Sequence, residues 1–242
     1  MADGYVMIPP HSNRIAMVRK SFVFPLRSVV MGCLLLSLGT SAFAGKPENV
    51  TDAEMALLPQ YCPDTFGFKY GDAYFNTSPN APKWVALMGK NFWAMHHYCW
   101  ALINLGRAQK PSMPASQRQA TREYAISDLQ YVIENTTPDF IMLPEIFTKK
   151  GEILLSLKRP LEARDAFAKA RDLKPDYWPA YFQWGEYLMR AGQKKEAREV
   201  VEAGLSFAPD TRALRGLLAE LGGNPATVKP RLADEKPADR AN

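Results

Sequence analysis

The stretch that decides the fold is PEIFTKKGEILLSLKRPLEARDAFAKARDLKPDYWPAYFQWGEYLMRAGQKKEAREVVEAGLSFAP, residues 144–209. Six small, apolar or proline positions in its first half recur 34 residues later. The matched pairs are Gly151 with Gly185, Leu154 with Leu188, Ala163 with Ala197, Phe167 with Val201, Ala170 with Gly204, and Pro175 with Pro209. An internal repeat is a stronger guide to fold than local propensity. The stretch therefore predicts two copies of one helical hairpin.

The repeated residue types have physical reasons in such a hairpin. Gly151 and Gly185 fall within predicted helices, where glycine costs about 1 kcal/mol relative to alanine, so close helix contact must compensate. Ala163 and Ala170 lie seven residues apart and share one helix face. Pro175 ends the second helix, because the residue before a proline avoids the helical conformation. The pattern predicts two closely packed helices in each unit.

The 34-residue period resembles the tetratricopeptide repeat, a helix-turn-helix unit whose copies stack into a solenoid. The resemblance departs from the family pattern at Lys150, where the family usually carries an aliphatic residue. It implies an all-α fold, a short helical-hairpin solenoid, with an aromatic-rich irregular cap before it. It also implies a protein-binding function, because repeats of this family receive peptides on the concave side formed by their first helices.

Flanking helices complete the predicted stack, since about three units and atypical ends are needed for stability. Thr211 is placed to cap a short end helix, and a degenerate repeat is expected to begin with one long helix at 83–108. The predicted organisation is a leader at 1–44, the cap with its long helix at 45–109, the second helix of the degenerate repeat at 110–143, repeats at 144–177 and 178–211, a capping helix at 212–223 and a disordered tail at 224–242.

The N-terminus has the form of a secretory signal peptide. Basic residues precede an apolar run at 29–38, and small residues after it predict cleavage following Ala44. The run has about ten residues, whereas a membrane span needs about 20, so the mature protein is not expected to be transmembrane. Met17 is a candidate for the true start. Cys33 offers an alternative interpretation as a lipidation site.

Charge excludes one class of partner after the leader is removed. Residues 1–44 contain four of the 30 basic and one of the 25 acidic residues, which leaves a net charge of about +2. Binding to nucleic acid would need a clustered basic face, and this composition does not predict one. No nucleic-acid partner is expected. A protein or peptide of the bacterial cell envelope is the expected partner.

The cysteine count predicts one disulfide. Only Cys62 and Cys99 remain after cleavage, in a compartment that is oxidising if the chain is exported. Their bond would hold the irregular segment after residue 60 against the long helix. A zinc site is a weaker alternative, because the adjacent His96 and His97 point about 100° apart on a helix and cannot easily share an ion. No metal or cofactor is expected.

Aromatic residues are dense between residues 61 and 100, next to a capping-box pattern at Thr51 and Glu54. Packing of the loop over the helix is the favoured interpretation. The alternative is a surface that stacks against glycans, because flat aromatic faces bind with little loss of entropy. The residues of this alternative surface are Tyr61, Phe68, Tyr70, Tyr74 and Trp84.

Catalysis finds little support in the sequence. The mature chain holds only two histidines as candidate bases, and no Gly-x-Ser-x-Gly elbow or phosphate-binding glycine loop is present. Paired carboxylates such as Asp64 and Asp72 are better explained as turn residues than as a glycosidase pair. A hydrolase remains the less favoured alternative, and no catalytic residues are assigned.

The resemblance implies where a peptide would lie. The outward positions of the first helices would be Glu145, Thr148, Glu152, Leu155 and Ser156 in the first repeat, and Phe182, Glu186, Met189 and Arg190 in the second. The lysine and asparagine pattern of repeats that clamp a terminal carboxylate is absent. A mixed acidic and apolar groove favours a basic or amphipathic peptide. The sequence thus predicts an exported, periplasmic, non-catalytic adaptor or assembly factor, with a glycan-binding envelope protein as the alternative.

Overall fold

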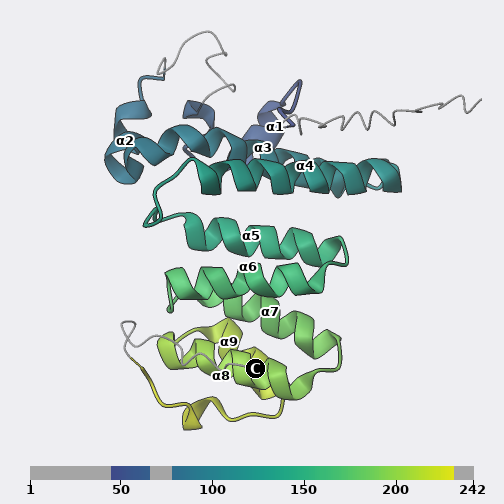
Figure 1. Ribbon diagram of the computed structural model, residues 1–242, viewed down its shortest axis with the longest axis vertical. Helices are drawn as coiled ribbons and strands as arrows, with labels where there is room; N and C mark the ends of the chain where they lie inside the picture. The colour runs from purple at the N-terminus through teal and green to yellow at the C-terminus, as the bar shows by residue number, and fades with distance from the viewer. Residues whose placement is uncertain (1–44, 66–77, 232–242) are drawn as a thin grey trace, which may run out of the picture. The chain divides into compact units, whose positions relative to one another are not determined.

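The computed structural model describes residues 45–65 and 78–231. In Figure 1 the helices follow one another down the view in chain order from α3 to α8. The helices are α1 (Asp52–Ala56), α2 (Ala81–Met88), α3 (Met95–Ala108), α4 (Ala115–Glu134), α5 (Leu143–Ser156), α6 (Pro160–Leu173), α7 (Trp178–Arg190), α8 (Lys194–Phe207) and α9 (Arg212–Glu220), with 3-10 turns η1 (Cys62–Asp64), η2 (Gly89–Ala94) and η3 (Pro225–Thr227). The all-α fold class predicted from the sequence is confirmed.

The two hairpins α5–α6 and α7–α8 have the same turn. Each first helix ends with a 6→1 backbone hydrogen bond, from Arg159 N to Leu154 O and from Gln193 N to Leu188 O, both 2.9 Å. The residue before each donor has a positive φ, 60° at Lys158 and 79° at Gly192. These residues are 34 positions apart, so the period extends to the left-handed turn residue itself.

The helical glycines are sites of close helix approach, as the sequence predicts. A Cβ at Gly151 would lie 2.7 Å from the Phe167 ring, and one at Gly185 would lie 2.6 Å from Val201 Cγ2. Phe167 and Val201 are fully buried in the facing helices α6 and α8. The absence of a side chain therefore lets each first helix rest directly on its partner.

The core consists of two clusters that meet at α5. Leu154 on one side of α5 belongs to a cluster that continues through α6, α7, α8 and α9. Ile146 and Ile153 belong to a second cluster with α3 and α4. Because α5 supplies both, the hairpin α3–α4 continues the stack as the degenerate repeat that the sequence suggests. The unusual Lys150 of α5 donates a hydrogen bond to Gln130 of α4 at 2.8 Å.

The predicted long helix at 83–108 is not continuous, which corrects the sequence prediction. α2 ends at Met88, and Gly89 follows it with a φ of +63°. The chain then runs through the 3-10 turn η2 before α3 starts at Met95. A left-handed glycine ends the α-helical hydrogen-bond pattern and redirects the chain. Only α3 therefore serves as the first helix of the degenerate repeat.

The structure also corrects the prediction for the segment after α9. Residues 224–231 were expected to start a disordered tail, but they have a defined path. Asn224 caps η3 by accepting from Ala226 N at 3.0 Å, Val228 packs against the C-terminal core, and Arg231 N donates to Ser206 O at 2.6 Å. In Figure 1 this segment is the yellow chain that runs beside α8. Residues 232–242 lie outside the described residues.

The two expected helix caps differ. Thr51 and Glu54 form the capping box of α1, with Glu54 N donating to Thr51 Oγ1 at 3.2 Å and Thr51 N donating to Glu54 Oε2 at 3.0 Å. Thr211 occupies the N-cap position of α9, but its side chain makes no capping bond. Within residues 45–65 and 78–231, none of the helices is both long and apolar enough to cross a membrane. The leader, Met17 and Cys33 lie outside the described residues.

Candidate functional site

The first helices of the hairpins form a face, here called the first-helix face, made of α3, α5, α7 and α9. α5 contacts α7, and α7 contacts α9. The face carries two hollows. The N-terminal hollow has a volume of about 440 Å³ between α1, α3 and α5, and the C-terminal hollow has a volume of about 510 Å³ between α7 and α9. Both volumes lie in the range of ligand-binding clefts.

Five of the predicted groove residues line these hollows. Glu152 and Ser156 line the N-terminal hollow. Phe182, Glu186 and Met189 line the C-terminal hollow, opposite Leu217 of α9. The structure thus divides the predicted groove into two separate depressions on the same face.

Glu145 and Thr148 both make hydrogen bonds within the fold, and the burial of Thr148 corrects its assignment as an outward position. The Tyr98 hydroxyl of α3 donates a hydrogen bond to the Glu145 carboxylate. Thr148 is only 3% exposed, and its hydroxyl donates to Pro144 O at 2.8 Å. Glu145 is partly buried and Thr148 is buried, so Thr148 is not available to a partner. Leu155 is likewise partly buried against the C-terminal core.

The charges on the face are largely paired within their own helices. Glu152 accepts from Lys149 at 2.6 Å, and Glu186 lies 3.5 Å from the exposed Arg190. These pairs are i,i+3 and i,i+4 neighbours at the surface, where an ion pair contributes little stability. The groove therefore presents both signs of charge beside apolar side chains, whereas the sequence suggested a mixture of acidic and apolar positions.

The N-terminal hollow includes residues that the sequence reasoning missed. Leu57 follows α1 and is 86% exposed, and Leu102 and Leu105 of α3 line the same hollow. Their position depends on how the segment around α1 lies against α3, which is a long-range feature with no local signal. The only local signal in the sequence for an apolar surface at this hollow was the pair Leu57 and Leu58 after the capping box.

The Glu54–Arg107 ion pair holds α1 on α3. Arg107 donates from Nε to Glu54 Oε1 at 2.8 Å and from Nη2 to Glu54 Oε2 at 2.9 Å, a bidentate arrangement. These bonds hold the pKa of Glu54 well below its usual range. Because α1 forms one wall of the N-terminal hollow, this pair positions part of the candidate site.

Removal of Arg107 is expected to weaken the pH dependence of stability in acid. The pKa of Glu54 is depressed in the folded state, so the pair stabilises fully above the ordinary carboxyl pKa of 4.5 and loses its contribution as the pH falls towards the folded value. Arg107→Ala should therefore cost about 1 kcal/mol at pH 7 and less at pH 3, measured by urea unfolding. Lys110→Ala is the control, because Lys110 lies 3.6 Å from Glu54 and is mostly exposed. Equal losses at both pH values in Arg107→Ala would contradict this role.

The described part of the aromatic surface is packed internally. Tyr61 is 7% exposed and contacts Trp84 edge to face at 5.9 Å between ring centroids. Trp84 Nε1 donates to Asp64 Oδ2 at 2.7 Å, and the Ser78 hydroxyl donates to Asp64 Oδ1 at 2.6 Å. These contacts fit the packing interpretation better than a glycan-stacking surface. Phe68, Tyr70 and Tyr74, together with Asp72, lie outside the described residues.

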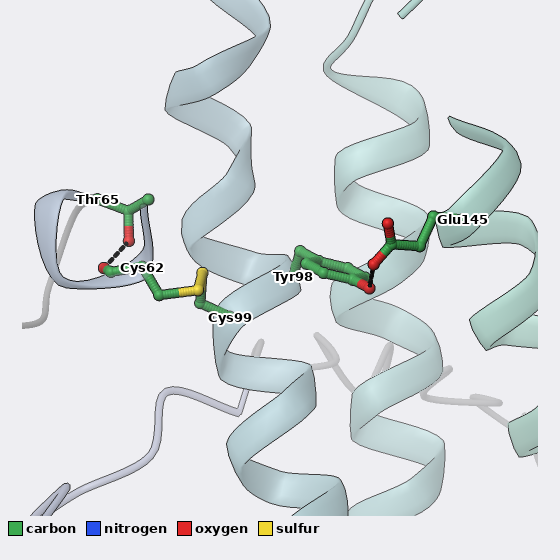
Figure 2. Close-up of a disulfide and its surroundings, with 5 residues drawn as sticks. All are labelled: Cys62, Thr65, Tyr98, Cys99 and Glu145. Atoms are coloured by element: carbon green, nitrogen blue, oxygen red, sulfur yellow. Dashed lines mark hydrogen bonds between the residues drawn. A yellow bond between two sulfur atoms is a disulfide. The ribbon is translucent and has the colours of Figure 1, made fainter. Parts of the chain in front are cut away.

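Cys62 and Cys99 form the expected disulfide. Figure 2 shows the bond joining the turn η1 to α3, while the neighbouring Tyr98 points to the other side of α3 and meets Glu145 on α5. The Thr65 hydroxyl donates to Cys62 O at 2.8 Å and closes the turn. One helix thus carries both the covalent attachment of the cap and the contact with the first clear repeat.

His97 makes a polar contact between α3 and α4, whereas His96 makes one with the turn before α3. His97 Nδ1 is 2.7 Å from Asp128 Oδ1 of α4, and both residues are buried. Burial raises the pKa of Asp128, and the interaction with His97 opposes that shift. His96 Nδ1 lies 2.6 Å from Trp93 O. With both thiols bonded to each other, this arrangement pairs α3 with α4 and offers no zinc ligand set among the described residues.

A stack of helical hairpins with hollows on the first-helix face is the architecture of an interaction scaffold. Residues 154–221, from the end of α5 through α9, match the family model of the tetratricopeptide repeat. This segment is similar to the tetratricopeptide repeat, a family whose members typically bind proteins and are non-catalytic. The searches of curated proteins and of solved structures gave no match.

Proposed function

We propose that this protein is a non-catalytic adaptor or assembly factor that binds one protein partner across its first-helix face. The observation that carries the proposal is the pair of hollows on that face, about 440 and 510 Å³ in volume, each with an apolar wall and charged margins. Interfaces derive most of their affinity from a few apolar or aromatic side chains that enter such depressions. The tetratricopeptide repeat match supports the same class of function.

The chemistry of the hollows favours an amphipathic partner segment. In the C-terminal hollow, Phe182, Met189 and Leu217 surround the space that an apolar anchor would fill. Glu186 and Arg212 lie at the same hollow with opposite charges. A partner helix with apolar residues on one face and both signs of charge beside them would complement this pattern. A purely basic peptide would meet Arg190 and Lys149 as well as the carboxylates.

The proposed location is the periplasm or outside of a bacterial cell, after cleavage following Ala44. Two features support it: the signal-like leader in the sequence and the Cys62–Cys99 disulfide, since disulfides persist mainly in oxidising compartments. The proposed partner is accordingly a protein of the cell envelope.

Site-specific photo-crosslinking in the native envelope tests the proposal. A photoreactive residue is placed at Phe182 or at Leu105, one in each hollow. The control position is Leu161, which is 69% exposed on the second helix α6. The same partner is expected to crosslink from both hollow positions and not from the control. A partner captured at Leu161 and at neither hollow position would overturn the assignment of the face.

A further inference from the structure

A third hollow lies away from the first-helix face, among the second helices. It has a volume of about 580 Å³ and is lined by α6, α8 and the C-terminal segment 227–231. Val228 packs against the core and Arg231 N donates to Ser206 O, so the segment forms a fixed wall. Tyr181 of α7 and Arg171 of α6 complete the lining.

Arg171 lacks the partner that a guanidinium requires. Among the described residues it makes no hydrogen bond and no ion pair, and its Nη1 is buried without a partner. Its guanidinium carbon instead lies 5.3 Å from the centre of the Tyr181 ring. Burial lowers the pKa of Arg171, which reflects the cost of holding the charge there. A buried guanidinium without a hydrogen-bond partner is stabilised by an anion that reaches it.

The repeat shows that this position does not need a charge. The residue 34 positions after Arg171 is Leu205, which is 2% exposed in the core. In the degenerate repeat, the alignment that pairs Ala163 with Ala125 pairs Arg171 with Ile133, which is also packed against the core. An apolar residue thus serves the fold at both equivalent positions. Arg171 carries a desolvation cost that packing does not explain.

Tyr181 supplies a second unused donor. It is 2% exposed, and its hydroxyl has no hydrogen-bond partner. Burial raises the pKa of Tyr181 to about 12, so the hydroxyl keeps its proton and can donate at neutral pH. The equivalent residue in the preceding repeat is Phe147, which has no hydroxyl. The two unusual residues of this hollow are therefore both hydrogen-bond donors.

We propose that the hollow between α6, α8 and residues 227–231 binds a carboxylate group, which Arg171 holds with the Tyr181 hydroxyl as a further donor. The planar guanidinium matches a carboxylate through two parallel hydrogen bonds. Lys229 and Arg231 add positive charge at the margin, whereas Glu199 and Glu202 add negative charge. This near balance favours a singly charged carboxylate over a doubly charged phosphate.

Calorimetric titration of the full chain at fixed ionic strength tests the site. The probes are propionate, its neutral analogue propionamide, and a blocked peptide with one central glutamate or glutamine. Propionate or the glutamate peptide should bind at least about tenfold more tightly than its neutral counterpart. Arg171→Leu, which installs the residue of the second repeat, should remove this preference. Arg164→Leu is the matched control on α6, because Arg164 is exposed and paired with Asp165.

Each outcome has a defined meaning. A preference for the glutamate peptide identifies an acidic protein segment as the occupant, and a preference for propionate alone identifies a free acid. A full-length variant with Asp234, Glu235 and Asp239 neutralised tests competition by the carboxylates that follow Arg231 in the sequence. If it binds the probes more tightly than the wild type, those carboxylates are the occupant. The proposal fails if Arg171→Leu retains the preference, or if no carboxylate probe binds the wild type or this variant.

Discussion

Replacing Cys62 and Cys99 together by alanine is expected to lower the free energy of unfolding by about 3 to 4 kcal/mol. The two residues are 37 positions apart, and both are fully buried between η1 and α3. In the chain-entropy model the disulfide restricts the unfolded chain, and its loss restores that freedom. Urea unfolding of the oxidised wild type and the double variant measures the difference.

The reduced wild type is the natural control for this experiment. It should unfold close to the double variant, because neither has the covalent link. The loss should also be local, with faster proteolysis before α3 than within α5–α8, since the C-terminal core does not include the disulfide. Equal stability of the oxidised wild type and the variant would show that the bond does not hold the cap.

Gly151→Ala is expected to destabilise the protein by about 1 to 2 kcal/mol, although alanine is the better helix former. The new Cβ would lie 2.7 Å from the ring of Phe167, which is fully buried, so the ring or the helix would have to shift. The overpacking cost therefore exceeds the gain in helix propensity of about 1 kcal/mol. The measurement is the free energy of unfolding in urea.

Two comparisons isolate the cause. Gly106→Ala, in α3, places a Cβ with nothing within 4 Å and should be neutral or stabilising by up to about 1 kcal/mol. In a Phe167→Ala background the clash is absent, so Gly151→Ala should lose its cost. A destabilisation of the same size in both backgrounds would refute the close-contact explanation of the repeated glycine.

The repeats were predictable because the residue pattern of each hairpin is local in the sequence and occurs in two copies. Gly151 and Gly185, each opposite a buried side chain of the second helix, occur at one period, and the period extends to the turn residues Lys158 and Gly192. The disulfide was predictable for a different reason, because only two cysteines follow the leader. Neither inference needed knowledge of long-range packing.

The candidate site was only partly predictable because exposure depends on neighbours that are remote in sequence. Thr148 was assigned an outward position from the repeat pattern but is buried, and Glu145 accepts a hydrogen bond from Tyr98, 47 positions earlier in the chain. Leu57 was missed because its place beside α3 depends on the Glu54–Arg107 pair, which spans 53 positions. The apolar residues on both sides of Gly89 suggested one continuous helix at 83–108, but α2 ends just before this glycine.

The same limit applies after α9. A run of prolines and charges without an apolar period predicted disorder, yet Val228 and the backbone of Arg231 secure residues 224–231 against the C-terminal repeat. One apolar side chain and one backbone hydrogen bond are too small a signal to recognise in a sequence. Their consequence is large, because this segment forms a wall of the hollow that contains Arg171.

The central claim is that a protein partner occupies the first-helix face, and the crosslink yield at Phe182 compared with that at Leu161 tests it most directly. Phe182 is partly exposed and lines the C-terminal hollow, whereas Leu161 is 69% exposed on the second helix α6. The account predicts a partner adduct at Phe182 that is absent at Leu161 and is reduced when Met189, which lines the same hollow, is replaced by aspartate. Equal yields at the two positions, or a yield that Met189→Asp leaves unchanged, would contradict it.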